Sequence, residues 1–174
     1  TKLVLVAGPS SAGKTTFSKR LCTHLRVNGV RPSLISVDDY FVGDDRNPRD
    51  SKGNLDYEHI EAIDLERLHA DITTLLAGGV IKRRAFDFKT KHGYDLDEEV
   101  TLENNGVLVM EGIHCLNPRL TERIDVSHTF LIYVSALTQL GVDRNCRIST
   151  TDNRLIRRMV RDNAHRGHKP LSTL

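Results

Sequence analysis

The chain has 174 residues, of which 39% are hydrophobic and 28% charged, as is usual for a folded single domain. Its 25 lysines and arginines nearly balance 23 aspartates and glutamates, which argues against a protein that binds nucleic acid through overall positive charge. The apolar runs are shorter than the roughly 18–20 residues that a membrane-spanning helix needs. We therefore expect neither nucleic acid nor a membrane as partner.

Short apolar runs predict the strands of the fold. They alternate with amphipathic stretches, which is typical of an α/β protein with a mostly parallel sheet and helices on both faces. We expect one three-layer domain over residues 1–174, with residues 82–102 forming short strands or a hairpin. The expected strands of the main sheet cover residues 3–7, 34–37, 107–110 and 130–134.

Apolar spacing of three to four residues predicts the helices. The first continues from the first strand to near Gly29, and a second covers 65–76 with Asp64 as its N-cap. A third runs from about residue 153 to 165, with Thr151 or Asp152 as its cap. Between the second strand and the second helix lies a long polar stretch, and loops of that length are often functional.

The cysteines and histidines show no metal-binding pattern. Cys22, Cys115 and Cys146 are expected to be reduced thiols of a cytoplasmic protein, because they form no CxxC pair. His165 and His168 have no acidic or cysteine partner nearby in sequence and are expected at the surface. The chain has no initiator methionine and no signal peptide, so we expect a piece of a longer or processed protein.

The segment GPSSAGKT, residues 8–15, matches the phosphate-binding pattern G-x-x-x-x-G-K-[ST] between a buried strand and an amphipathic helix. Glycines let the backbone curl so that N–H groups point at phosphate oxygens, and the helix adds the positive end of its dipole. Lys14 is expected to contact the β- and γ-phosphates and Thr15 to bind Mg²⁺. The predicted ATP-binding residues here are Gly8, Ser10, Ser11, Ala12, Gly13, Lys14, Thr15 and Thr16.

An acidic partner for the metal is expected at the end of the apolar run 107–110. Glu111 follows that run directly, and the carboxyl ends of parallel strands face the ligand crevice. The sequence therefore predicts that Glu111 and Thr15 hold Mg²⁺. A helix-capping or solvent-facing role for Glu111 is the alternative.

Charge is strongly segregated along the chain. Residues 38–64 contain nine acidic and three basic residues, whereas residues 144–169 contain eight basic and two acidic ones. No N-K-x-D motif of GTPases and no LSGGQ-like signature of transporter ATPases is present. The arrangement favours a small-molecule kinase with separate sites for ATP and a hydroxyl acceptor and with a cationic lid.

Five segments besides the phosphate loop carry a family resemblance: ISVDDYF (35–41), NLDYEHIEAID (54–64), FDF (86–88), VLVMEGIH (107–114) and TDNRLIRRMVRDNAHRG (151–167). In this order they resemble the uridine kinase and phosphoribulokinase family of P-loop kinases, and within it the uridine kinase-like proteins. The resemblance implies transfer of the γ-phosphate of ATP, with Mg²⁺, to the 5′-hydroxyl of a nucleoside, uridine or cytidine, as in pyrimidine salvage. It also implies a further strand after the lid helix, so we expect the C-terminal part of the domain to be missing here.

The resemblance assigns roles on the acceptor side. Asp38 would accept the proton of the attacking hydroxyl, with adjacent Asp39 as the alternative. Tyr40 would line the acceptor pocket or belong to the core, and Asp56 would bind the ribose hydroxyls. Phe86 and Phe88 would contact the base or lie in the core, and His92 stands one residue from the position of the family's base-contacting histidine.

An arginine-rich helix is expected near the end of the chain. Arg154, Arg157, Arg158 and Arg161 share one face by their spacing, with Leu155, Ile156, Met159 and Val160 towards the other side. Such a cluster is either a solvated surface or a lid over an anion. Beside a phosphate loop we expect the lid, with Arg154, Arg158 and Arg161 at ATP, Arg158 catalytic, and Arg157 and Arg166 at the acceptor.

Two other functions stay open at this point. One is a related kinase for another hydroxyl acceptor, such as a sugar phosphate or pantothenate. The other is a regulatory domain that binds nucleotide without turnover. The sequence also leaves open a homo-oligomer.

Overall fold

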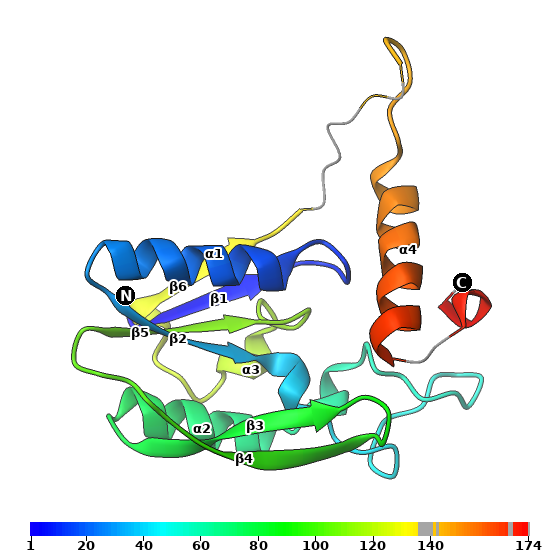
Figure 1. Cartoon of the computed structure of the whole chain (residues 1–174). Helices are drawn as coiled ribbons and strands as arrows, with labels where there is room; N and C mark the ends of the chain where they lie inside the picture. The colour runs from blue at the N-terminus through cyan, green and yellow to red at the C-terminus, as the bar shows by residue number, and fades with distance from the viewer. Residues whose placement is uncertain (136–140, 142, 167–168, 174) are drawn as a thin grey trace.

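The centre of the molecule is a parallel four-stranded sheet with the strand order β2-β5-β1-β6 (Figure 1). The computed structural model describes residues 1–135, 141, 143–166 and 169–173. The four strands confirm the predicted runs, and the sheet consists of β1 (Leu3–Ala7), β2 (Arg31–Ser36), β5 (Gly106–Glu111) and β6 (Thr129–Tyr133).

Strand β2 begins three residues earlier than predicted and includes Pro32. A proline has no N–H to donate to a neighbouring strand, so the prediction began at Leu34. The proline is tolerated because β2 pairs with β5 and lies at one end of the sheet order.

Alternate side chains of β1 enter two hydrophobic cores on opposite faces of the sheet. Val4 and Val6 pack with Cys22 of α1 (Lys14–Val27). Leu3 and Leu5 belong to the larger core on the other face, which includes side chains of α2 (Leu65–Leu76). Figure 1 shows α1 on one side of the sheet and α2 on the other, which confirms the predicted layers.

A β-hairpin lies on the same side as α2. Strands β3 (Val80–Asp87) and β4 (His92–Thr101) pair antiparallel, with a register shift between Lys82 and Arg84. This confirms the hairpin that was one of two expectations for residues 82–102. Arg67 of α2 contacts Asp95 of β4 at 3.3 Å, and this ion pair links the helix to the hairpin.

The helix caps agree with prediction in one case and not in the other. Asp64 caps α2 by accepting a hydrogen bond from the Arg67 N–H at 3.1 Å, as predicted. The expected cap of α4 (Thr150–Arg161) at Thr151 or Asp152 is wrong, because the Ser149 hydroxyl accepts the Asp152 N–H at 3.1 Å. All three residue types cap helices well, so the pattern alone could not separate them.

Short turns order the polar segment between β2 and α2. A 3₁₀ helix over Val37–Tyr40 follows β2 directly. Further on, the Asp50 carboxylate accepts N–H groups from Lys52 and Asn54, each at 2.8 Å. The antiparallel bridge between Phe41 and Ile63 brings the segment back towards α2.

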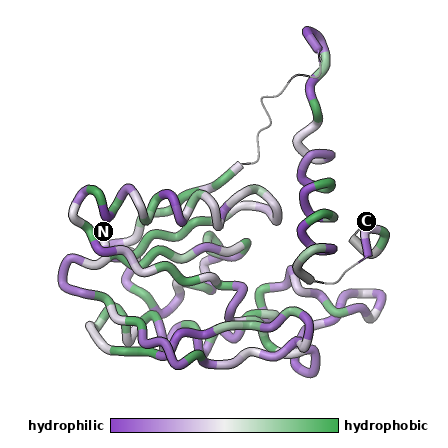
Figure 2. Tube along the Cα trace, in the orientation of Figure 1, coloured by the Kyte–Doolittle hydropathy of each residue, from purple (hydrophilic) through white to green (hydrophobic). Residues whose placement is uncertain are grey.

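The short helix α3 (Pro118–Thr121) follows β5 and leads to β6, where the sheet ends in exposed apolar side chains. Phe130, Leu131 and Tyr133 are 58%, 59% and 64% exposed. Figure 2 shows hydrophobic residues concentrated in the strands and hydrophilic residues alternating with hydrophobic ones along α4. Among the described residues, no helix is long and apolar enough to cross a membrane, and all three cysteines are free thiols.

Candidate functional site

The predicted phosphate-binding loop joins the carboxyl end of β1 to the first turn of α1. Gly13 stands at the helix start with φ of 98°, a conformation that favours glycine. A Cβ on Gly8 would lie 2.4 Å from the Val134 carbonyl oxygen, so only glycine lets the loop pass this close to the end of β6. The Ala12 N–H donates to the Pro9 carbonyl oxygen at 3.1 Å and closes the turn.

Thr15 and Glu111 are brought together as predicted for a metal site. The Thr15 hydroxyl donates to Glu111 Oε1 at 2.8 Å, and the Ser36 hydroxyl at the end of β2 donates to the same oxygen at 3.3 Å. Burial raises the pKa of Glu111, and the nearby charge of Asp38 adds to the shift. The Lys14 ammonium, at the start of α1, donates to the Pro9 carbonyl oxygen at 3.3 Å.

This donor set fits Mg²⁺. A carboxylate and a hydroxyl are hard oxygen ligands, and Mg²⁺ at nucleotide sites typically takes few protein ligands together with phosphate oxygens. The buried Glu111 carboxylate has hydroxyl partners from Thr15 and Ser36, both of which are compatible with a cation beside them. Among the described residues, no group of three His, Cys, Asp or Glu side chains forms a metal site of its own.

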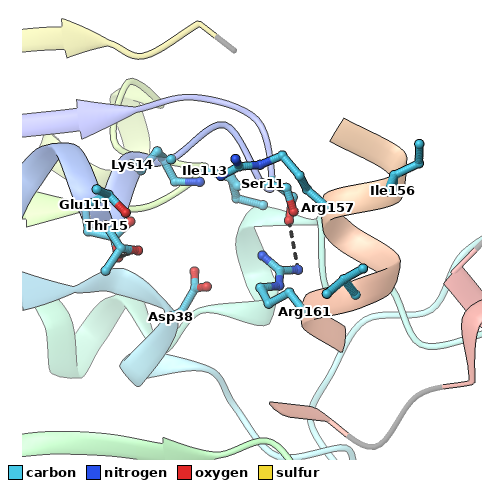
Figure 3. Close-up of a pocket in the computed structure, with 13 residues that line it drawn as sticks. Ser11, Lys14, Thr15, Asp38, Glu111, Ile113, Ile156, Arg157 and Arg161 are labelled. Carbon is cyan, nitrogen blue, oxygen red and sulfur yellow. Dashed lines mark hydrogen bonds between the residues drawn. The ribbon is translucent and has the colours of Figure 1, made fainter. Parts of the chain in front are cut away.

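The two adjacent aspartates after β2 lie in different surroundings. Asp38 lines a cavity that also includes Lys14 and Glu111 (Figure 3). Asp39 lies on the side of the hairpin, where its carboxylate accepts the N–H of Phe86. Burial, together with the charges of Asp38 and Glu111, raises the pKa of Asp39 to about 6. Of the two carboxylates, Asp38 is the one in the lining of this cavity.

The cavity has a volume of about 510 Å³ and lies between the phosphate loop and helix α4 (Figure 3). Four residues of α4 contribute to its wall: Ile156, Arg157, Val160 and Arg161. Ile156 and Val160, expected on the other side of the helix from the arginines, also line the cavity, because the helix turns one edge of each stripe towards it. Among the described residues, the lining comprises Ser10, Ser11, Gly13, Lys14, Thr15, Thr16, Asp38, Glu111, Ile113, Ile156, Arg157, Val160 and Arg161.

The arginines of α4 contact two different loops. Arg154 donates to the Ser10 carbonyl oxygen at 3.2 Å, and Arg161 donates to the Ser10 hydroxyl at the same distance. Arg158 instead pairs with Glu58 of the acidic segment at 3.3 Å and with Asp162 of its own helix end at 3.6 Å. The helix thus joins the phosphate loop to the segment expected to bind the acceptor. The Arg166 side chain falls outside the described part of the structure, as do the side chains of His165 and His168.

The structure favours the core alternative for Tyr40. Its side chain is 1% exposed, and its hydroxyl donates to the Asp71 carboxylate of α2 at 2.9 Å. Burial and the Asp71 charge both raise the pKa of the Tyr40 hydroxyl. Tyr40 therefore holds the 3₁₀ helix against α2 and lies outside the cavity lining.

Phe86 and Phe88 form an aromatic cluster with Phe41 and Tyr57 beside the acidic segment. The ring centroids of Phe86 and Phe88 are 5.2 Å apart, and those of Phe41 and Phe86 are 5.6 Å apart. Phe86 is buried and Phe88 partly buried, so the core alternative fits Phe86, whereas Phe88 keeps some surface for a ligand. His92 is exposed at the start of β4.

Asp56 is half-buried, and its carboxylate accepts the Glu58 N–H at 2.9 Å. Its charge acts on His114, as does the charge of Asp38, so these three side chains share one region. Sequence reasoning missed Ser36 and His114, although both stand at the carboxyl ends of strands, where ligand contacts gather.

Fold and site together place the chain among the P-loop phosphotransferases. The nucleotide loop, the buried acid at the end of the adjacent strand and the cationic helix occur in the arrangement that such enzymes require. The chain belongs to the Phosphoribulokinase / Uridine kinase family, whose sequence model matches residues 3–172.

Several curated relatives of this chain are named uridine kinase. A uridine kinase of Deinococcus deserti is 31% identical over 97% of this chain and 72% of its own length. A uridine kinase of Halobacterium salinarum is 29% identical over 94% of this chain, which spans only 64% of that protein. These relatives are longer than this chain of 174 residues.

Two solved structures share the fold. A possible uridine kinase from Bacillus stearothermophilus matches with a TM-score of 0.60 and 23% identity, covering 76% of this chain and 69% of that chain. A candidate fructose transport system kinase from Silicibacter sp. TM1040 matches with a TM-score of 0.67 and 17% identity, covering 99% of this chain and 76% of that chain. At these identities the likeness supports the P-loop kinase fold and no particular acceptor.

Proposed function

We propose that the protein transfers the γ-phosphate of ATP to the 5′-hydroxyl of a nucleoside, uridine or cytidine, giving the 5′-monophosphate and ADP. The observation that supports this most is the single cavity that combines Lys14, Asp38 and Glu111 with arginines of α4. It offers cations for phosphate and a carboxylate for a hydroxyl proton. The curated relatives named uridine kinase support the choice of acceptor.

The donor nucleotide would lie along the phosphate loop. Backbone N–H groups of the loop and the N-terminus of α1 would bind the phosphate oxygens, with Lys14 at the β- and γ-phosphates. Thr15 and Glu111 would hold Mg²⁺, which neutralises charge on the β- and γ-phosphates when bound. Arg157 and Arg161, which line the same cavity, would stabilise charge that develops on the transferred group.

The acceptor hydroxyl would approach from the side of Asp38. The Asp38 carboxylate would take the hydroxyl proton as the oxygen forms its bond to the γ-phosphorus, while the bond from that phosphorus to the β–γ bridging oxygen breaks and ADP leaves. Asp56 would accept hydrogen bonds from ribose hydroxyls, and the exposed part of Phe88 would contact the base. Positioning supplies most of the rate in such reactions, because the protein does little covalent chemistry.

The test is ATP-dependent phosphoryl transfer with purified protein across a panel of acceptors. The panel contains uridine, cytidine, adenosine, ribulose 5-phosphate and pantothenate, with ADP release and phosphorylated product both measured. We expect product from uridine or cytidine. Transfer only to ribulose 5-phosphate or pantothenate would replace the proposed acceptor, and ATP binding without transfer to any acceptor would indicate a regulatory domain.

A further inference from the structure

His114 lies on the turn that follows β5, three residues after Glu111. The Gly112 N–H donates to the Val6 carbonyl oxygen at 3.1 Å, and the Asn117 N–H donates to the His114 carbonyl oxygen at 2.8 Å. A Cβ on Gly112 would lie 2.7 Å from Cβ of Val37, the residue before Asp38. The turn that bears His114 is therefore fixed tightly against the 3₁₀ helix that bears Asp38.

The imidazole of His114 is half-buried and uses one of its two nitrogens. The ring hydrogen-bonds the main chain of His59, a contact that favours the protonated ring, so the ring donates there. Nε2 is shielded from solvent and has no hydrogen-bond partner among the described residues, which leaves Nδ1 as the donor. Burial lowers the pKa of His114, so the ring is neutral at pH 7 and Nε2 presents a bare lone pair.

His114 lies close to the two aspartates that we expect at the acceptor. The charged groups that act on His114 are Asp38, His59 and Asp56, and its neighbour Ile113 lines the cavity together with Asp38. A buried acceptor without a hydrogen-bond partner is unfavourable, and a donor from a ligand would remove that penalty. Because the aspartates also accept hydrogen bonds, the three side chains together suit a ligand with several hydroxyl groups.

We propose that His114 is a specificity-determining residue of the acceptor site, whose Nε2 accepts a hydrogen bond from a secondary hydroxyl of the ribose. This inference rests on the proposed function, since it concerns the nucleoside that the enzyme phosphorylates. It gives the enzyme a means to reject deoxynucleosides. A deoxy analogue leaves Nε2 unpaired, and sites built to bond a hydroxyl discriminate strongly against ligands that lack it.

Two amide substitutions separate the nitrogens of the ring. His114→Asn places an amide near the position of Nδ1 and removes the acceptor at Nε2, whereas His114→Gln places an amide oxygen within reach of the Nε2 position. His24→Asn is the matched control, because His24 is exposed on α1 and has no place in the candidate site. For each protein, kcat and KM are measured with uridine, 2′-deoxyuridine, 3′-deoxyuridine and ATP.

We expect His114→Asn to lower the ratio of kcat/KM for uridine over one of the deoxy analogues by at least about tenfold. The KM for ATP stays within about twofold, His114→Gln recovers part of the ratio, and His24→Asn behaves as the wild type. A merely structural role would instead reduce kcat/KM equally for uridine and both analogues. That outcome, or an unchanged ratio, overturns the inference while the proposed function stands.

A second readout does not depend on turnover. The ¹⁵N resonance of His114 Nε2 should move when the wild-type protein is saturated with uridine, and it should stay in place with 2′-deoxyuridine or with 3′-deoxyuridine. If the chemical shift of His114 Nε2 does not change when uridine is bound at saturation, the proposed role of His114 is overturned. If no nucleoside binds or reacts, the proposed function fails first and the inference fails with it.

Discussion

Lys14 and Asp38 lie on opposite sides of the cavity, and their substitutions should affect different halves of the reaction. Lys14→Ala removes the charge expected at the γ-phosphate and should lower kcat/KM for ATP about 10²–10³-fold. Asp38→Asn should leave ATP affinity within about twofold and lower kcat about 10²–10⁴-fold. Kinetics and calorimetric titration with a non-hydrolysable ATP analogue measure both.

Lys19→Ala serves as the control for the lysine, because Lys19 is exposed further along α1. It should behave as the wild type in both measurements. An undiminished kcat in Asp38→Asn would remove Asp38 as the general base and return attention to Asp39.

Asp39 should make stability depend on pH. Its pKa is about 6 in the folded protein, above the 3.8 of an unperturbed aspartate, so the folded state holds this proton more strongly than the unfolded state. Stability therefore falls as pH rises from about 4 to 6 and stays reduced above that window. Asp39→Asn, which cannot ionise, should unfold with a free energy higher by at most about 3 kcal/mol at pH 7 and similar to wild type near pH 4.

Urea denaturation at pH 4 and pH 7 without Mg²⁺ checks this difference. A difference between Asp39→Asn and wild type that is the same at both pH values would show that burial does not govern the ionisation of Asp39.

The phosphate loop could be located from the sequence because its residues are contiguous and its glycines are required by the backbone conformation of the loop. Pairing of Thr15 with Glu111 could also be predicted, since both stand at the carboxyl edge of the sheet. Ser36 and His114 could not be found this way. Their contacts depend on how closely the ends of β2 and β5 pack, and no motif position reports that distance.

At the scale of elements, Arg158 of α4 allows an effect on stability to be separated from an effect on catalysis. Arg158 and Glu58 are 40% and 67% exposed, and such pairs contribute well under 1 kcal/mol to stability. Arg158→Ala should thus leave the melting temperature within about 2 °C while lowering kcat at least about 10²-fold, because we expect its guanidinium to act on the transferred phosphate.

Glu58→Gln isolates the ion pair, because it leaves Arg158 in place. It should change kcat by no more than a few-fold, as measured by the same coupled assay. An equally large loss in Glu58→Gln and Arg158→Ala would mean that the arginine serves to hold the acidic segment rather than the phosphate.

The hairpin and the N-cap of α4 are two features that the sequence pattern alone did not determine. Strand β4 has charged residues at successive positions, and partners such as Arg83 for Glu98 and Lys82 for Asp97 lie across the hairpin. Alternation between apolar and polar residues is therefore weak, so residues 82–102 were expected only as strands or a hairpin. Several residues that can act as N-caps stand close together at the start of α4, and the tertiary structure determines which of them caps the helix.

For the whole molecule, layers followed from the alternation of strands and helices, whereas the strand order did not. The order β2-β5-β1-β6 depends on which apolar faces meet, and the sequence does not state that. It leaves β6 at an edge, with Phe130 58% exposed. Exposed apolar edge strands favour association between chains.

We expect Phe130→Lys to reduce concentration-dependent association of the 174-residue chain, because a lysine on an edge strand opposes pairing with another chain. Analytical ultracentrifugation between about 5 and 200 μM would measure this. Val27→Lys is the control, since Val27 is 80% exposed at the end of α1. Equal effects of both substitutions would assign the association to general surface hydrophobicity.

Helix α4 touches the phosphate loop through Arg154 and Arg161 and the acidic segment through Arg158. A ligand that shifts this helix from one side also changes the contacts that the helix makes on the other side. Binding free energies linked in this way are reciprocal: the factor by which nucleotide tightens acceptor binding equals the factor by which acceptor tightens nucleotide binding. The two substrates would thus favour a ternary complex over either binary one. With ATP alone bound, the site would be incompletely assembled, and hydrolysis of ATP by water would be slow.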